Sequence, residues 1–424
     1  MHSRPARRAA ALAAGAATLL LGALPLAAQR ADAPPLTVTG AMALARTHHP
    51  ALAVASARRR ATVGAARQEA ALPNPVLEWR QENVGSPFER DRFVTLSQPI
   101  DLTGRRLALR AESGFVDERA EADSVTAARG VEAAAARAYW GASLALALLD
   151  VAATQAADAE RLALMETDRA REGAVAGLVA MRAGVEAERA RLAEATARVE
   201  WNRAHTELAR ALGVDADALP PVPPMALATR PSAPVPAVDA LSAAAFEQRS
   251  DLVALRAAVD AARRRRSAEN RAVIPDVSLQ LGTMQSAGFT ARTFGLAVPL
   301  PLLDRNAGGR ERAAGSLDLA EAELRAAEHA ARTEVTGAVE SLSSLLAAPG
   351  PSADSLATRA AEVARVAHAA YAEGGVSLFE LLDARRAHAE ALTAALRWSA
   401  ELHRARLELN RASGAPLTES LETP

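Results

Sequence analysis

Two segments of the chain alternate between apolar and polar residues, and each lies between long stretches with helical spacing. In the first segment, residues 76–100, Leu77 and Trp79 point to one side if the chain is extended. The residues between and after them, on the opposite side, are Glu78, Arg80 and Glu82. This alternation predicts a strand with one apolar and one water-facing side, followed by a return strand.

The second segment, residues 277–300, is a copy of the first at an offset of 200 residues. Pro75 corresponds to Pro275, and Pro99 corresponds to Pro299. Its alternation is cleaner, since Leu279, Leu281, Phe294 and Leu296 all share one predicted face. The chain therefore carries two related hairpins, one in each half.

The remaining pattern is helical and repeats with the same spacing. In the first half a helix precedes the hairpin, and a long helix follows from Thr103 to Arg171. A turn at 172–174 leads to a return helix with Leu178, Val185, Leu192 and Val199 at intervals of seven, which is typical of a coiled-coil seam. In the second half we expect one helix from about Val238 to Val273, a long helix to Ala372, a turn at 373–375 and a last helix.

This order predicts an internal duplication. The expected divisions are residues 29–213 for the first repeat, 214–236 for a Pro-rich connector, 237–414 for the second repeat and 415–424 for a tail. Pro349 and Pro351 predict a break in the second long helix, near 349–351, that has no counterpart in the first.

The first 28 residues have the features of a secretory signal peptide: early arginines, an apolar run and then small residues. No later segment has the length and apolarity expected of a membrane-spanning helix, so we expect any membrane span to be made of strands. Each predicted strand is long enough to cross a bilayer when tilted. Four strands do not close a barrel, so spanning would require oligomers, either a dimer with eight strands or a trimer with twelve.

Composition narrows the possibilities further. Half of the residues are hydrophobic but only 3% are aromatic, which favours long, closely packed helices over a bulky globular core. The formal net charge is −1 and the basic residues are all arginine, which gives no indication of a nucleic-acid partner. The absence of cysteine excludes disulfides and a lipid-bearing N-terminal cysteine.

Several stretches, taken in order, resemble the TolC family of outer-membrane efflux proteins. They are HHPAL, LPNPVLEW, QPIDLTGRR, GLVA, RSDLVAL, IPDVSLQLG, VPLPLLDRNAGG and YAEGGVSLFELLDARR. The motif PLPLLDRNAGG is most similar to the branch of this family that serves heavy-metal efflux of the resistance-nodulation-division type.

The resemblance implies a mainly helical fold with membrane strands. Long antiparallel helices would form a trimeric α-helical barrel in the periplasm, and four strands per protomer would contribute to a 12-stranded outer-membrane β-barrel. Leu77 and Trp79 would then meet lipid, while Glu78, Arg80 and Glu82 would face the lumen.

The resemblance also implies a function and partners. The chain would be a passive exit duct, supplied by an inner-membrane pump through a periplasmic adaptor protein, with heavy-metal cations as one possible substrate. Two alternatives remain at the level of sequence: the exit duct of a type I protein secretion system, and a soluble periplasmic coiled-coil adaptor or scaffold. The two bilayer-length hairpins favour the channel over the adaptor.

No catalytic or cofactor-binding pattern is present, and we expect no enzyme activity and no cofactor. The histidines are dispersed without the close spacing of a zinc site, so no bound metal is expected. Near the second turn, Glu380 and Asp383 share a helix face. The resemblance makes them and Tyr371 candidates for a periplasmic gate. Arg182 stands where some relatives carry an acidic residue, and we expect it to face Asp383.

Overall fold

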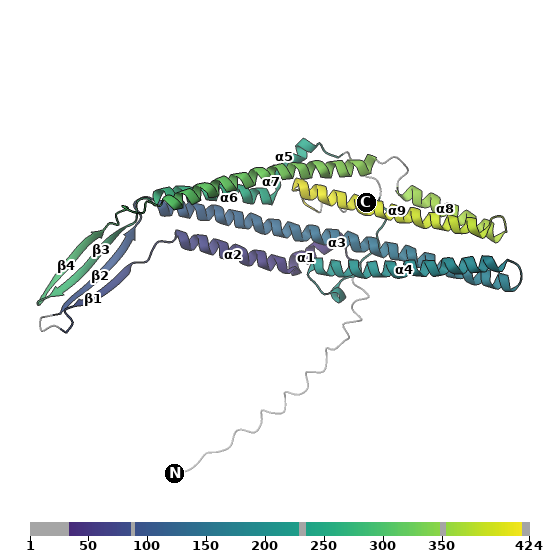
Figure 1. Cartoon of the computed structure of the whole chain (residues 1–424), viewed down its shortest axis with the longest axis horizontal. Helices are drawn as coiled ribbons and strands as arrows, with labels where there is room; N and C mark the ends of the chain where they lie inside the picture. Colours follow the sequence, from purple (N-terminus) through teal and green to yellow (C-terminus); the bar gives the residue numbers. More distant parts are fainter. Residues whose placement is uncertain (1–33, 86–89, 229–234, 348–352, 418–424) are drawn as a thin grey trace, which may run out of the picture.

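The computed structural model describes residues 34–85, 90–228, 235–347 and 353–417. The predicted signal peptide, the predicted helix break at 349–351 and most of the predicted tail lie outside these ranges. The described chain forms an elongated molecule with a β-sheet at one end and two helical hairpins at the other (Figure 1).

The two halves of the chain contain matching series of elements. The first half contains α1 (Val38–His48), α2 (Pro50–Ala70), β1 (Val76–Glu82), β2 (Asp91–Ile100), α3 (Arg105–Arg171) and α4 (Gly177–Leu212). The second half contains α5 (Val238–Gln248), α6 (Ser250–Arg271), β3 (Val277–Ser286), β4 (Phe289–Ala297), α7 (Ala307–Ala347), α8 (Ala353–Ala372) and α9 (Leu378–Ser413). The predicted fold of long helices with four strands is confirmed.

The four strands form one antiparallel sheet in the order β1-β2-β3-β4. The two hairpins meet through β2 and β3, where Leu96 lies opposite Leu281. Strands β1 and β4 are the edges, so each carries backbone hydrogen-bonding groups that have no partner within the sheet.

By length and composition, helix α3 contains a stretch of 18 residues that is apolar enough to cross a membrane, so the expectation that no later segment would have these properties was wrong. The alanine- and leucine-rich middle of α3 explains its apolarity. There the helix contributes to two clusters of buried residues, through Ala135, Tyr139 and Ala142 in one and Ala147 in the other. Small alanine side chains let neighbouring helices approach closely, and they raise the mean hydropathy of the helix that carries them.

The predicted coiled-coil seam of α4 does not pack against any other described part of this chain. Helix α4 uses Ala183, Ala187 and Leu208 as buried residues, whereas the seam residues are exposed. The exposed seam residues are Leu178, Val185, Leu192 and Val199. Alanine is the smaller residue and allows α3 and α4 to lie close together, which leaves the larger side chains of the seam pointing away.

Each repeat begins with two helices that are separated by one extended residue. In the first repeat His49 separates α1 from α2, and in the second Arg249 separates α5 from α6. The expectation of one continuous helix from Val238 to Val273 was therefore wrong. The Arg249 guanidinium donates to Asp251 at 2.7 Å and to Glu334 at 2.8 Å, so contacts from other elements stabilise the break.

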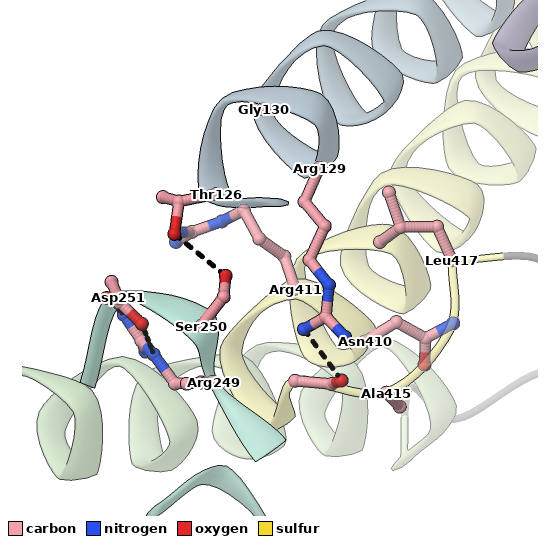
Figure 2. A pocket seen from close by; sticks show the side chains of 11 residues that line it. Thr126, Arg129, Gly130, Arg249, Ser250, Asp251, Asn410, Arg411, Ala415 and Leu417 are labelled. Carbon is pink, nitrogen blue, oxygen red and sulfur yellow. Dashed lines mark hydrogen bonds and ion pairs between the residues drawn. The ribbon is translucent and has the colours of Figure 1, made fainter. Parts of the chain in front are cut away.

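A glycine at the end of the return helix packs against each break. Gly213 ends α4 with φ +71°, and a Cβ atom there would lie 2.7 Å from the Cα of His49. Gly414 ends α9 with φ +77°, and its Cβ would lie 3.1 Å from the backbone nitrogen of Arg249. Figure 2 shows this second junction, which encloses a cavity of about 140 Å³. Here Arg129 donates to the Gly414 carbonyl oxygen at 3.1 Å.

The connector between the repeats ties helices of both halves together. The Met225 backbone nitrogen donates to the carbonyl oxygen of Ser143 in α3 at 3.0 Å. The Ala228 backbone nitrogen donates to the hydroxyl of Ser399 in α9 at 2.9 Å. Both serines are buried, so the connector supplies hydrogen bonds to polar groups that water does not reach.

One buried histidine lies close to this connection. The ring of His403 in α9 stacks on Trp140 in α3, with centroids 3.8 Å apart and planes within 5°. Its Nδ1 atom has no hydrogen-bond partner among the described residues. Burial, together with the charge of Arg406, lowers the pKa of His403 to about 4.

His403 should therefore make the fold sensitive to acid. Well above pH 6.5 the His403 ring is neutral in both the folded and the unfolded chain. Between pH 6.5 and pH 4 the ring binds a proton in the unfolded chain but stays neutral in the folded chain. We expect the free energy of unfolding to fall by about 3 kcal/mol across this window because of this group. His403→Phe keeps the stacking and should remove that part of the loss in urea titrations, whereas His329→Phe, on an exposed position of α7, should not.

Candidate functional site

The sheet has one apolar and one polar face, and the strand register fixes which residues share each face. Residues directly opposite each other in a ladder point to the same side. The apolar face carries Leu77, Trp79, Val94, Leu96, Leu279, Leu281, Phe294 and Leu296. Leu77 is 69% exposed and Trp79 is 63% exposed, so this face is not covered by any part of the described chain.

The predicted lumen residues lie on the opposite face. Glu78 pairs with Thr95, Arg80 with Phe93, and Glu82 with Asp91. Arg80 lies 3.3 Å from Glu82, and its guanidinium stands over the Phe93 ring at 4.8 Å. A sheet with this distribution is stable where one side meets an apolar medium and the other meets water.

At the far end of the molecule, the tips of the two helical hairpins pack against each other. Leu162 and Ala183 of the first hairpin form a buried cluster with Leu378 and Leu381 of the second. An ion pair joins the hairpins as well, between Arg386 of α9 and Glu186 of α4 at 3.1 Å. The tips are thus held together by a small apolar contact with polar links around it.

A polar cluster that we name the tip latch joins α3 to α8. It consists of Glu166, Arg169 and Tyr371. Glu166 is fully buried, and it accepts a hydrogen bond from Arg169 at 3.2 Å. Arg169 also donates to the Tyr371 hydroxyl at 3.4 Å. Burial and the neighbouring Glu166 carboxylate raise the pKa of Tyr371 to about 12, so the hydroxyl keeps its proton at neutral pH.

Glu166 and Arg169 were not predicted from the sequence, although Tyr371 was. Pairs of opposite charge three residues apart are common on exposed helices, and this pair looks the same in the sequence. Only the complete burial of Glu166 sets it apart, because a carboxylate is rarely buried without a specific partner.

The structure gives Glu380 a local role. Ser377 precedes α9, its hydroxyl accepts from the Glu380 nitrogen, and its own nitrogen donates to the Glu380 carboxylate at 2.7 Å. This is a capping box, which satisfies backbone groups at the start of a helix. These hydrogen bonds lower the pKa of Glu380.

Asp383 and Arg182 are both exposed near the hairpin tips. Within the described residues of this single chain neither takes part in an ion pair, and the expected pairing of Arg182 with Asp383 is not formed. Among the same residues there is no group of three or more metal-ligating side chains.

Comparison with known proteins points to one family. Residues 241–415 match the family model described as outer membrane efflux protein. Over 370 residues, the sequence is 26% identical to the cobalt-zinc-cadmium resistance protein CzcC of Cupriavidus metallidurans. This alignment covers 84% of this chain and 85% of that protein.

Solved structures share the fold over nearly the whole chain. The outer-membrane channel OprN aligns with a TM-score of 0.73 and 20% identity, over 90% of each chain. CusC, whose structures describe folding and transmembrane channel formation, aligns with a TM-score of 0.68 and 19% identity, over 91% of this chain and 93% of the other.

Proposed function

Because this chain belongs to the outer membrane efflux protein family, we propose that three copies assemble into one continuous channel across the outer membrane and the periplasm. The observation that supports this most directly is the sheet. Its apolar face is exposed, and its edges β1 and β4 are unpaired among the residues that the structure describes. Pairing β1 of one copy with β4 of the next would satisfy both edges, and three copies would close twelve strands.

The exposed seam of α4 supports the same assembly. A row of large apolar side chains at intervals of seven is stable in water only when another helix covers it. Helix α4 lies along the outside of the helical bundle in Figure 1, where a neighbouring copy can reach it. The seam would then bury against a helix of the adjacent protomer and help to form a helical tunnel.

The channel would be a passive duct for substrates delivered by an inner-membrane pump through a periplasmic adaptor. Similarity to CzcC, named as a cobalt-zinc-cadmium resistance protein, favours divalent metal cations as substrates and metal efflux over protein secretion. The exposed carboxylate of Asp383 near the hairpin tips is suitable for attracting cations, and the Glu380 carboxylate, which caps α9, adds negative charge beside it. A soluble adaptor would not expose the apolar face that this sheet exposes.

The orientation of the sheet can be tested with single labels, since the chain has no cysteine of its own. Nitroxides at Leu77→Cys and Glu78→Cys occupy adjacent positions on opposite faces of β1. In lipid vesicles, the label at 77 should be more accessible to oxygen, which concentrates in the bilayer, and the label at 78 to a water-soluble nickel chelate. Equal accessibility at both positions would contradict the proposed channel.

A further inference from the structure

Exposed aliphatic side chains gather where the sheet meets the helices. We name this group the junction collar, and it consists of Ile100, Leu102, Leu107, Val298, Leu300, Leu302 and Leu303. Leu302 is 72% exposed and Leu303 is fully exposed. Isolated exposed leucines are common on protein surfaces, but all of these residues lie within seven residues of the ends of β2 and β4, and an apolar zone of this size needs a partner.

The collar continues the apolar face of the sheet. The alternation that includes Leu96 on β2 reaches Ile100, the last residue of that strand, and Leu102 follows two residues later. In the second repeat Leu296 lies on β4, which ends at Ala297, and Leu300 and Leu302 follow that end. These two series are related by the same offset of 200 residues as the hairpins. The collar therefore lies at and directly beyond the strand ends that carry the sheet's apolar face.

Arginines follow the collar on the helical side. Arg110, Arg271, Arg305, Arg310 and Arg312 are exposed, and none of them pairs with a carboxylate among the described residues. Among the described residues, Arg271 donates to the backbone carbonyl oxygens of Thr103 and Gly104 and to no carboxylate.

Most nearby acids are already engaged, and Glu311 is the one exposed carboxylate that lies directly between Arg310 and Arg312. Asp276 pairs with Arg106 at 3.2 Å, and Asp101 accepts hydrogen bonds from the backbone at the start of α3. The zone therefore has a local excess of positive charge beside its apolar surface. Aliphatic side chains next to unpaired arginines match the boundary between acyl chains and phosphate headgroups.

From this combination we propose that the junction collar and its arginines bind anionic phospholipids of the periplasmic leaflet. The leucines contact acyl chains, and the arginines donate hydrogen bonds to phosphate oxygens. The proposal rests on the proposed function, since it requires the sheet to span the outer membrane. A second copy of the chain is a poorer occupant, because copies that pair through β1 and β4 leave the apolar face on the outside of the sheet.

The first test locates the collar relative to lipid. Nitroxides are placed singly at Leu303→Cys, at Leu77→Cys in the sheet, and at Leu319→Cys, an exposed leucine of α7 roughly 20 Å further from the sheet. In vesicles of phosphatidylethanolamine and phosphatidylglycerol, labels at 77 and 303 should favour oxygen, and the label at 319 should favour the nickel chelate. Oxygen preference at 77 alone would overturn the collar proposal and leave the proposed function intact. A label at 303 that is shielded from both reagents would place the collar between copies and would also overturn it.

The second test addresses the arginines. The double variant Arg305→Gln, Arg310→Gln is compared with Arg325→Gln, which removes an exposed arginine from α7 away from the sheet. Each protein is extracted from vesicles that contain phosphatidylglycerol, and retained lipids are counted by native mass spectrometry. We expect retention to fall about tenfold in the double variant and to stay unchanged in the control. Unchanged retention in the double variant, or an equal loss in the control, would overturn the proposal.

Discussion

Replacing Tyr371 with phenylalanine should raise the conductance of the channel in planar bilayers. The change removes the hydroxyl that joins the second hairpin to Arg169 and Glu166 of the first. A hydrogen bond to a charged group contributes about 1.5–3 kcal/mol, so the population with separated tips should increase about tenfold or more. We expect Glu166→Gln to act in the same direction, because it removes the buried charge that holds Arg169 in place.

The chain provides a matched control for this experiment. Its other tyrosine, Tyr139, is buried in the middle of α3, far along the helix from the tips. Tyr139→Phe should leave conductance unchanged. If Tyr371→Phe and Glu166→Gln both conduct like the unaltered protein, the tip latch does not restrict the channel.

Asp383→Ala tests a different property, the preference of the channel for cations. Loss of an exposed acidic ring should reduce that preference without opening the channel.

Gly213→Ala should strongly destabilise the first repeat. The residue has a positive φ, which costs a residue with a Cβ atom about 1–2 kcal/mol. The new Cβ atom would also lie 2.7 Å from the His49 Cα, and backbone cannot move aside as a flexible side chain can. We expect a total loss of about 3 kcal/mol or more in the free energy of unfolding, measured by circular dichroism in urea.

Alanine substitutions at two other glycines serve as comparisons for the stability of the Gly213→Ala variant. Gly414→Ala should be destabilising for the same reasons at the second junction, though less so because its contact of 3.1 Å is longer. Gly130 lies within α3 with nothing within 4 Å of the added Cβ, so Gly130→Ala should stabilise the helix by roughly 0.5–1 kcal/mol. Similar stability of the Gly213 and Gly130 variants would show that the contact with His49 is unimportant.

The sequence predicted the helices, the two hairpins and their apolar faces because these depend on periodicity along the chain. The break at Arg249 was not predictable, since neither proline nor glycine adjoins it and its causes are Asp251, Glu334 and the end of α9.

The candidate site was less predictable for a related reason. Tyr371 could be named from a motif, but the partners that give it a role come from α3, about two hundred residues earlier in the chain. Glu380 was chosen for its charge, yet the structure uses that charge to cap α9. Local pattern identifies an element, whereas the partner of a polar side chain depends on how elements meet.

The join between β2 and β3 has a consequence for the order of events during biogenesis. Each hairpin pairs residues that are close in sequence, so it can form soon after its own segment leaves the secretion machinery. The pairing of Leu96 with Leu281 requires the whole first repeat and the start of the second. Contacts between such distant segments form slowly. An interval must therefore exist in which the inner edges of both hairpins are uncovered, and in that interval the nascent chain depends on protection from aggregation.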